Sequence, residues 1–291
     1  MSVSANLVKE LRERTGAGMM ECKKALVEVD GDLEAAQELL RKRGQASADK
    51  KSGRIAAEGR IACAVDDAAA VLIEVNCETD FVAKDENFLN FVQQAADLAL
   101  EHQPADVTKL LALDARGAGT LEDARKDLIA KLGENINVRR FEYVRPQGQL
   151  GSYLHGSRIG VLVDIDGGDR SLSKDLAMHI AATNPSCVTA EQVPTDELET
   201  ERRILTEQAE QEGKPAEIVA KMVEGRLRKF LNEITLLGQP FVKDPDVNVA
   251  KLLKQQGATV RSFVRLEVGE GIAKKVENFD DEVQAQVEAQ R

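Results

Sequence analysis

The chain has 291 residues, and 39 Lys and Arg against 50 Asp and Glu give it a formal net charge of −11. That balance disfavours a general nucleic-acid-binding protein, which would carry a net basic surface. Eight Phe, two Tyr and no Trp leave Val, Leu, Ile and Ala to build the core.

Membrane and secretion signals are lacking from the sequence. It contains no run of 18 apolar residues, so no transmembrane span is expected. The first residues have no basic stretch followed by an apolar one, so we expect no signal peptide. Four cysteines without a Cys-x-x-Cys pair do not form a disulfide framework, which favours a reducing cytoplasm.

Residues 1 to about 45 are predicted to form a small three-helix unit. The first helix spans about Ser4–Arg14, and Thr15-Gly16-Ala17-Gly18 ends it. A second helix leads to the turn Asp30-Gly31-Asp32, where Asp32 is placed to cap the third. Three short helices are typical of a ubiquitin-associated-type bundle, which more often binds a partner than carries out chemistry.

Residues 41–60 differ in character from what precedes them. They hold seven basic and two acidic residues, and Ile55 is their only large apolar side chain. We expect a linker and a domain boundary here. A solvated connection is favoured over the alternative, a nucleic-acid-binding arm.

Strands replace helices after residue 60. Ile61–Val65 and Val71–Val75 flank Asp66-Asp67 and predict a β-hairpin. The following elements are a polar loop (Asn76–Lys84), an amphipathic helix (about Asn87–Leu100), two helical stretches (near 104–113 and 120–132) and a strand (Asn137–Val144).

This pattern recurs about ninety residues later. Gly151–His155 and Arg158–Ile165 are again two short strands, and a helix over Ser173–Ala182 follows. The sequence of Val161–Ile165 is similar to that of Val71–Val75. The repeat predicts two related α+β subdomains, each with an antiparallel sheet covered by helices.

Residues 189–235 predict a helical hairpin. Charged helices over about 195–212 and 216–235 are joined by Gly213-Lys214-Pro215, so they must run antiparallel. Their narrow apolar stripe is typical of a protruding coiled coil. The stripe either packs within the hairpin or offers a surface for a partner or a second copy, and both alternatives stay open.

The last part of the chain returns to mixed structure. A helix near Val247–Gln255 precedes a strand over Ser262–Val268. An amphipathic helix over about 275–289 has few large apolar residues, so it needs a surface to lie on.

The sequence contains no recognisable catalytic centre. His102, His155 and His179 have neither the spacing nor the neighbours of a metal site, and no Gly-rich phosphate loop or nucleophile elbow is present. Cys77 lies in a polar loop, where a pairing with His155 is conceivable but an inert buried cysteine is favoured. We therefore predict a non-enzyme without a cofactor or a metal.

One loop carries an unusual apolar side chain. Between the strand end at Glu74 and Lys84, Phe81 follows Asp80 in otherwise polar surroundings. Spacing alone slightly favours Phe81 folding back as a hydrophobic staple on the next helix. The alternative is an exposed side chain that inserts into the pocket of a partner.

The segment Glu74–Lys84 resembles that of the elongation factor Ts family, the guanine-nucleotide exchange factors of elongation factor Tu in bacterial translation. Further blocks match in the family's order along nearly the whole chain: Leu11–Leu26, Gly133–Arg140, His155–Val163, Gly238–Val242 and Val268–Gly271. The departures are peripheral, in a lengthened stretch near 101–121 and in the C-terminal tail.

The resemblance implies an α+β fold in several parts. The implied parts are a ubiquitin-associated-like helical domain with a basic linker (1–54), core subdomain N (55–147), core subdomain C (148–188 and 236–271), an inserted antiparallel coiled-coil hairpin (189–235) and a C-terminal helical module (272–291).

The resemblance also implies a site and a partner. Asp80 and Phe81 would enter elongation factor Tu beside its Mg²⁺ subsite, with Thr79 and Val82 supporting the loop, and GDP release would accelerate. The implied docking positions are Lys23, Met19, Met20, Leu132 and His155, although the Met pair fits a local core equally well. The partner would be bound in its GDP-bound and nucleotide-free forms, without direct contact to nucleic acid or membrane.

The resemblance also implies one assembly, and the sequence leaves two other functions open. Coiled-coil hairpins of this type mediate homodimerisation in some members of the family. A ubiquitin-associated-like interaction scaffold without exchange activity is the alternative function, and RNA binding through residues 41–60 is the third.

Overall fold

The computed structural model describes residues 3–117, 119–213 and 215–273, with only the backbone at 45–47 and 49. The chain forms two compact units. Unit 1 comprises Met1–Arg60, Ile73–Phe141 and Val268–Arg291, and unit 2 comprises Ile61–Leu72 and Glu142–Glu267. The helix expected over 275–289, and nearly all of the module expected over 272–291, lies outside the described residues.

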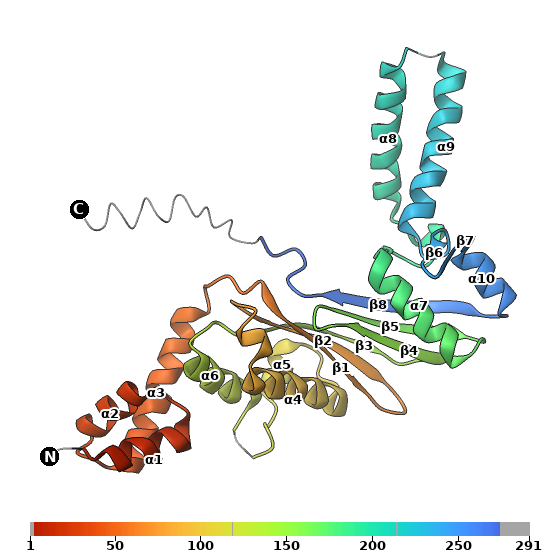
Figure 1. Cartoon of the computed structure of the whole chain (residues 1–291). Helices are drawn as coiled ribbons and strands as arrows, with labels where there is room; N and C mark the ends of the chain where they lie inside the picture. The colour runs from red at the N-terminus through yellow and green to blue at the C-terminus, as the bar shows by residue number, and fades with distance from the viewer. Residues whose placement is uncertain (1–2, 118, 214, 274–291) are drawn as a thin grey trace. The chain divides into compact units, whose positions relative to one another are not determined.

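Three helices open the chain, as predicted (Figure 1). They are α1 (Ala5–Thr15), α2 (Met19–Glu28) and α3 (Leu33–Lys51). The Asp32 carboxylate accepts hydrogen bonds from two backbone N–H groups at the start of α3. Gly16 ends α1 in the left-handed conformation, with φ of 68°, which glycine adopts without steric cost. Leu11, Cys22 and Leu26 are buried between the helices.

Helix α3 continues well into the segment expected to be a linker, so the linker prediction is wrong as far as Lys51. Arg, Lys, Gln and Ala are good helix formers. The positive charges of Lys50 and Lys51 in the last turn also favour a helix C-terminus. The helix also has a packing partner that the sequence pattern did not reveal. A Cβ atom on Gly44 would lie 2.9 Å from Cβ of Ala130 in helix α6 (Leu121–Leu132).

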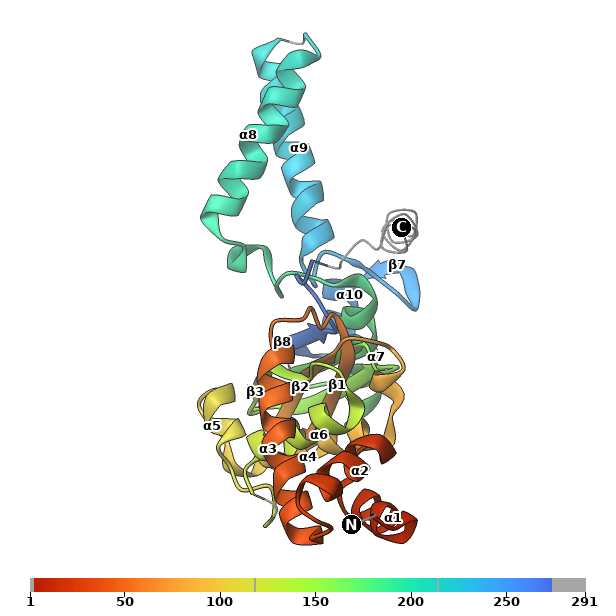
Figure 2. The same cartoon turned by 90° about the vertical axis from the view of Figure 1, so that its left-hand side faces the viewer.

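The first sheet has the order β1-β2-β3. The strands are β1 (Glu58–Val65), β2 (Ala70–Cys77) and β3 (Asn137–Val144), and β2 is buried along its whole length. Between β2 and β3 the chain forms a short 3-10 turn and three helices, η1 (Val82–Lys84), α4 (Glu86–His102), α5 (Val107–Leu111) and α6 (Leu121–Leu132). Figures 1 and 2 show α4 and α6 on one face of β3.

The second sheet is antiparallel, with the order β4-β5-β8. Its strands are β4 (Gln149–His155), β5 (Ile159–Asp166) and β8 (Thr259–Glu267), and helix α7 (Arg170–Thr183) follows β5. Leu162 in β5 pairs with Ser152 on one side and with Val264 on the other. In both sheets a central strand comes second in its hairpin and precedes a helix, which agrees with the predicted repeat.

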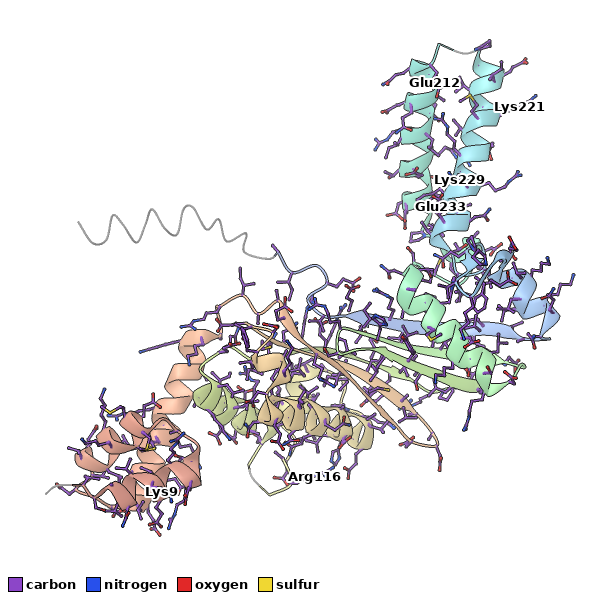
Figure 3. The ribbon with its side chains drawn as sticks, in the orientation of Figure 1. Lys9, Arg116, Glu212, Lys221, Lys229 and Glu233 are labelled. Carbon is purple, nitrogen blue, oxygen red and sulfur yellow. The ribbon has the colours of Figure 1, made fainter. Side chains whose placement is uncertain are left out.

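Two long helices follow a 3-10 turn, η2 (Ala190–Gln192), and run side by side in opposite directions (Figures 1 and 2). They are α8 (Thr195–Gln211) and α9 (Ala216–Ile234). Their apolar stripe is buried between them, including Leu205, Val223 and Leu227. The apolar stripe therefore packs within the hairpin. Lys229 and Glu233, labelled in Figure 3, form an ion pair of 3.7 Å along α9.

A small element that the sequence did not predict follows the hairpin. Strands β6 (Pro240–Phe241) and β7 (Asp244–Asn248) pair and lead into α10 (Val249–Gln255). Phe241 of β6 and its neighbours Gln239 and Val242 contact His179 of α7, which is fully buried. The backbone N–H of Val242 donates to its Nδ1 (3.2 Å), so the ring proton is on Nε2, 3.0 Å from Oε1 of Gln239.

Among the residues described, none of the helices combines the length and apolarity that crossing a bilayer requires.

Candidate functional site

The chain between β2 and α4 presents an exposed aromatic side chain. We call Glu78–Phe81 the Phe81 loop. Phe81 is 81% exposed, whereas Val82 and Ala83, which follow it, are buried. The hydrophobic-staple interpretation of Phe81 is therefore wrong. The ring faces solvent, and the next two residues, Val82 and Ala83, are the ones that enter the core.

Glu134 holds the start of the Phe81 loop. It lies just after α6, and its Oε2 accepts hydrogen bonds from the backbone N–H of Glu78 (3.0 Å) and of Thr79 (2.9 Å). Its Oε1 accepts from Oγ1 of Thr79 at 2.6 Å. The Thr79 hydroxyl also lies 3.4 Å from the N–H of Val82. Sequence reasoning missed Glu134, since a contact across more than fifty residues leaves no periodic signal.

A second set of bonds runs in the opposite direction. Oε1 of Glu78 accepts from the backbone N–H of Asn135 at 2.6 Å. The Asn135 side chain is buried and donates to the backbone carbonyl of Arg54 at 2.8 Å. The Arg54 guanidinium in turn lies 3.4 Å from the Glu78 carboxylate. The Phe81 loop is thus bonded to the α6–β3 junction and, through it, to the chain that follows α3.

Asp80 is the exposed charged residue of the Phe81 loop. Its carboxylate lies 2.7 Å from Nζ of Lys84, one helical turn further along. This hydrogen bond holds the pKa of Asp80 below its ordinary value, although the side chain is exposed. At neutral pH the loop therefore presents an anionic carboxylate next to an apolar ring.

Cys77 has no access to a substrate. It is fully buried, and its thiol donates to the carbonyl of Thr79 at 3.2 Å. Burial, with help from the nearby carboxylates of Glu134 and Glu58, raises the pKa of Cys77 to about 12. A protonated, buried thiol is a poor nucleophile, which agrees with the prediction of an inert cysteine.

The remaining predicted site residues lie on several elements. Met19 and Met20 are 53% and 64% exposed at the start of α2, so the local-core interpretation of this pair is wrong. Lys23 is exposed one turn further along the same helix. Leu132 is half-buried at the end of α6 in unit 1. His155 ends β4 in unit 2, where its Nδ1 lies 3.0 Å from Oη of Tyr153.

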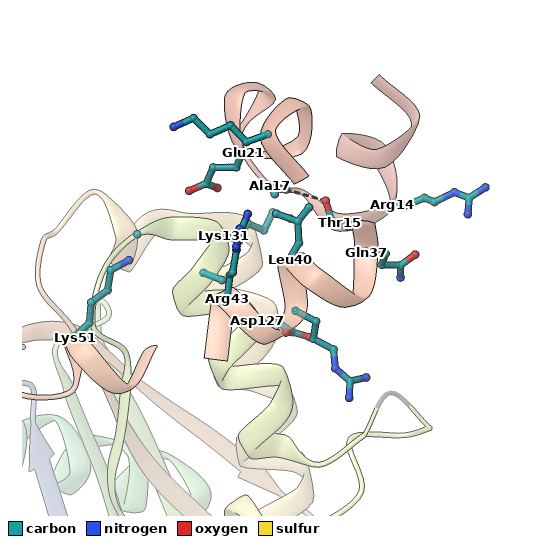
Figure 4. A pocket seen from close by; sticks show the side chains of 15 residues that line it. Arg14, Thr15, Ala17, Glu21, Gln37, Leu40, Arg43, Lys51, Asp127 and Lys131 are labelled. Carbon is teal, nitrogen blue, oxygen red and sulfur yellow. Dashed lines mark hydrogen bonds between the residues drawn. The ribbon is translucent and has the colours of Figure 1, made fainter. Parts of the chain in front are cut away.

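A cavity of about 500 Å³ lies between the N-terminal helices and α6 (Figure 4). Its lining is mostly charged, and Lys131 and Arg43 from this lining already bond Asn87 and Glu28. Small-molecule sites are predominantly apolar, and none of the predicted site residues lines this cavity. The exposed Phe81 loop is therefore the stronger candidate site.

Comparison with known proteins agrees with the resemblance seen in the motifs. Residues 78–270 match the family described as Elongation factor TS. Elongation factor Ts of Thioalkalivibrio sulfidiphilus is 60% identical over 290 residues, which cover 98% of this chain and 99% of that protein. The protein of the same name from Methylococcus capsulatus is 59% identical over 292 residues, covering 99% and 100%.

This chain belongs to the elongation factor Ts family. It is a translation factor that exchanges the nucleotide of elongation factor Tu, and it is not an enzyme. Exchange of a partner's nucleotide needs a surface that alters the partner rather than a catalytic centre of its own, so the scaffold and RNA-binding alternatives are set aside.

Three of the blocks that resemble elongation factor Ts meet around Glu74 in unit 1. This carboxylate is fully buried and accepts from Arg139 Nη1 (3.0 Å), Arg140 Nε (2.6 Å) and the backbone N–H of Gly269 (2.8 Å). Burial alone would raise the pKa of Glu74, but these bonds, together with one from Asn76, more than offset it and lower the pKa. The cluster fixes the strand from which the Phe81 loop emerges.

Proposed function

We propose that this protein releases GDP by inserting Phe81 into elongation factor Tu, with Asp80 beside it, so that the Mg²⁺ and phosphate subsite of the partner is disrupted. The observation that carries this proposal is the exposure of Phe81 on a loop whose backbone is held from Glu134. A large apolar side chain that stays in water has no role in its own core, and it gains stability when a partner buries it.

The physical basis of the proposal is the way in which a GTPase holds GDP. Backbone amides around the phosphates and a Mg²⁺ ion supply most of the binding energy. A side chain that displaces the groups around these phosphates therefore weakens the amide interactions and the Mg²⁺ interaction together. The anionic Asp80 adds local repulsion toward phosphate, or a hydrogen bond that competes for the same donors.

Linkage explains how the exchange factor leaves its partner. If binding of the exchange factor weakens nucleotide binding, then nucleotide must weaken binding of the exchange factor by the same ratio. GTP, which binds the emptied site, therefore expels the factor. The protein changes the rate of exchange and leaves the final equilibrium between the GDP and GTP forms unaltered.

Docking is proposed to use surfaces outside the Phe81 loop. Met19, Met20 and Lys23 are exposed on one turn of α2, which suits contact with a partner helix. Leu132 and His155 are proposed as further contacts, in unit 1 and unit 2 respectively. Both the GDP-bound and the nucleotide-free partner would be recognised, since docking must precede release.

The finer architecture is proposed on the same basis. The three N-terminal helices support a ubiquitin-associated-like domain over 1–54, and the core subdomains would span 55–147 and 148–188 with 236–271. The α8–α9 pair supports a coiled-coil insertion over 189–235. Homodimerisation through this hairpin would use exposed apolar residues such as Ile204 and Ile218. Because translation elongation takes place in the cytoplasm, the protein is placed there.

The test is stopped-flow release of a fluorescent GDP analogue from elongation factor Tu. The wild-type protein should accelerate release, and Phe81→Ala should lower the accelerated rate by about tenfold or more, as truncation of a buried interface anchor does. Asp80→Ala should have a smaller effect in the same direction. Val65→Ala, which truncates an apolar side chain that is 51% exposed, is the control and should leave the rate unchanged.

Two results would overturn the proposal. One is catalysed exchange by Phe81→Ala at the wild-type rate. The other is a Phe81→Ala variant that has lost its circular-dichroism spectrum and cooperative unfolding, because Phe81 would then be a structural residue.

A further inference from the structure

We infer that Glu134 is a positioning residue for nucleotide exchange, because its carboxylate holds the Phe81 loop in the form that presents Phe81 to the partner. This inference rests on the proposed role of Phe81. Glu134 would act through the Phe81 loop, to which it is bonded at the backbone and at the Thr79 hydroxyl.

The need for such a residue follows from the exposure of Phe81. With 81% of its surface in solvent, this side chain receives little support from its own chain. Its direction is therefore set by the backbone of the Phe81 loop. Whatever fixes that backbone also fixes where the ring points.

Glu134 fixes that backbone at two successive residues. One carboxylate oxygen accepts from the N–H groups of Glu78 and Thr79, and the other accepts from the Thr79 hydroxyl. The same hydroxyl lies within hydrogen-bond distance of the N–H of Val82. The loop is thus held at its start by a charged acceptor, and hydrogen bonds to a charged acceptor are the stronger kind.

The bonds between the two segments are reciprocal. Glu134 accepts from the backbone of Glu78, and Glu78 accepts from the backbone of Asn135 at 2.6 Å. The Asn135 amide also donates to carbonyls of Ser52 (3.4 Å) and Arg54 (2.8 Å), in the chain that follows α3. Glu134 and Asn135 therefore connect the Phe81 loop to the end of α3, the helix that follows the proposed docking helix α2.

Preorganisation explains the expected effect. A loop that is ordered before binding does not lose conformational entropy when its aromatic side chain inserts. Without Glu134, the backbone of Glu78 and Thr79 would have to be ordered during insertion, which reduces the population of the presenting form by about tenfold per freed residue. Docking through α2 would be little affected.

Three variants test this inference. Glu134→Ala removes all three acceptor contacts. Glu134→Gln keeps one oxygen for the two N–H groups, and its amide can donate to the Thr79 hydroxyl, so it should retain most of the function. Glu101→Ala, at the exposed end of α4, is the control for removal of a carboxylate.

The kinetic readout separates positioning from loss of folded protein. Release of the GDP analogue is measured over a range of exchange-factor concentrations. Glu134→Ala should lower the limiting rate by about tenfold to a hundredfold, according to whether one or both residues are freed, and leave the half-saturating concentration within about twofold of wild type. A merely unstable variant would do the opposite, because fewer active molecules raise the half-saturating concentration and leave the limiting rate intact.

Hydrogen–deuterium exchange of the free protein gives a readout that does not involve the partner. Amides of Glu78 and Thr79 should lose protection in Glu134→Ala and keep it in Glu134→Gln and Glu101→Ala. Unchanged protection in Glu134→Ala, an unchanged limiting rate, or a Gln variant as impaired as the Ala variant would overturn the inference. If wild type itself fails to accelerate release, the proposed function fails instead, and the amide readout still tests the geometry.

Discussion

Phe81 and Glu74 occupy opposite environments within a few residues of each other. Phe81 is an apolar ring in water, and Glu74 is a carboxylate without exposed surface. Each would destabilise an isolated chain, since burial of an unpaired charge and exposure of a large apolar group are both unfavourable. The buried carboxylate makes its hydrogen bonds within unit 1, whereas the exposed ring can be buried only by another molecule.

Truncation of Glu74 should therefore be among the most destabilising single changes in unit 1. Glu74→Ala leaves the guanidinium groups of Arg139 and Arg140 without their shared acceptor. The two arginines are 25% and 32% exposed and keep their bonds to Glu270, so the expected cost is that of lost hydrogen bonds to a charged group, about 1.5–3 kcal/mol. Urea denaturation should show this loss. Glu142→Ala, an exposed position on the same strand as both arginines, should change the free energy of unfolding by less than about 0.5 kcal/mol.

At the scale of the elements, local periodicity was sufficient to place most helices and strands. The strand over Asn137–Val144 was predicted with its observed bounds, and α4, α7, α8 and α9 differ from prediction by only a few residues at their ends. Periodicity reports which face of an element is buried, and this holds wherever the element packs on a core.

The errors arose where tertiary contacts override local signals. The segment after residue 41 has the composition of a linker, yet packing of Gly44 against Ala130 stabilises it as the end of α3. Strands β6 and β7 are too short to give an alternating pattern. Glu134 could not be predicted as a site residue, because its hydrogen-bond partners lie far away in the sequence.

Two helical glycines in contrasting surroundings allow a prediction for their helices. Gly225 in α9 has open space where a Cβ would be, whereas a Cβ on Gly44 would meet Ala130 at 2.9 Å. Gly225→Ala should stabilise the hairpin by about 0.5–1 kcal/mol, the usual helix-propensity gain. Gly44→Ala should lose that gain, since a crowded helix contact costs about 1–3 kcal/mol.

Thermal unfolding of both glycine variants, with urea denaturation to obtain free energies, checks this contrast. A Gly44→Ala protein as stabilised as Gly225→Ala would show that the α3–α6 contact is not close-packed. A Gly225→Ala protein less stable than wild type would show that α9 needs the glycine for another reason.

At the scale of the whole molecule, neither compact unit is a contiguous stretch of chain. Unit 1 contains three segments and unit 2 contains two. No single cut in the chain separates them, so stability has to be followed within each unit by site-resolved measurements rather than by truncation.

The pH dependence of stability should differ between the units because of His179 in unit 2. Burial lowers the pKa of His179 below its ordinary value, against a smaller opposing effect of Gln239. The unfolded chain therefore binds the proton more readily than the folded one, so stability is complete above about pH 6.5 and falls as the pH drops below it. The slope is at most about 1.4 kcal/mol per pH unit.

Hydrogen exchange of core amides between pH 7.5 and 5.5 measures this effect, after correction for the intrinsic rates. Core amides of α7 should lose protection over this range. His179→Gln should flatten the dependence, whereas His102→Gln, at an exposed position, should not. An α7 whose corrected protection is constant over this range would contradict the neutral, Nε2-protonated His179.

The strand order β4-β5-β8 has a consequence for how the protein folds during synthesis. β5 ends at Asp166, but its second neighbour begins only at Thr259. The third strand of this sheet thus leaves the ribosome after nearly all of the chain, and closing so long a loop is slow. The α8–α9 hairpin lies within that loop and can form early from local contacts. By folding first it brings Leu198 and Phe230 into one apolar cluster, which shortens the span that β8 must close and makes the hairpin a folding aid for this sheet.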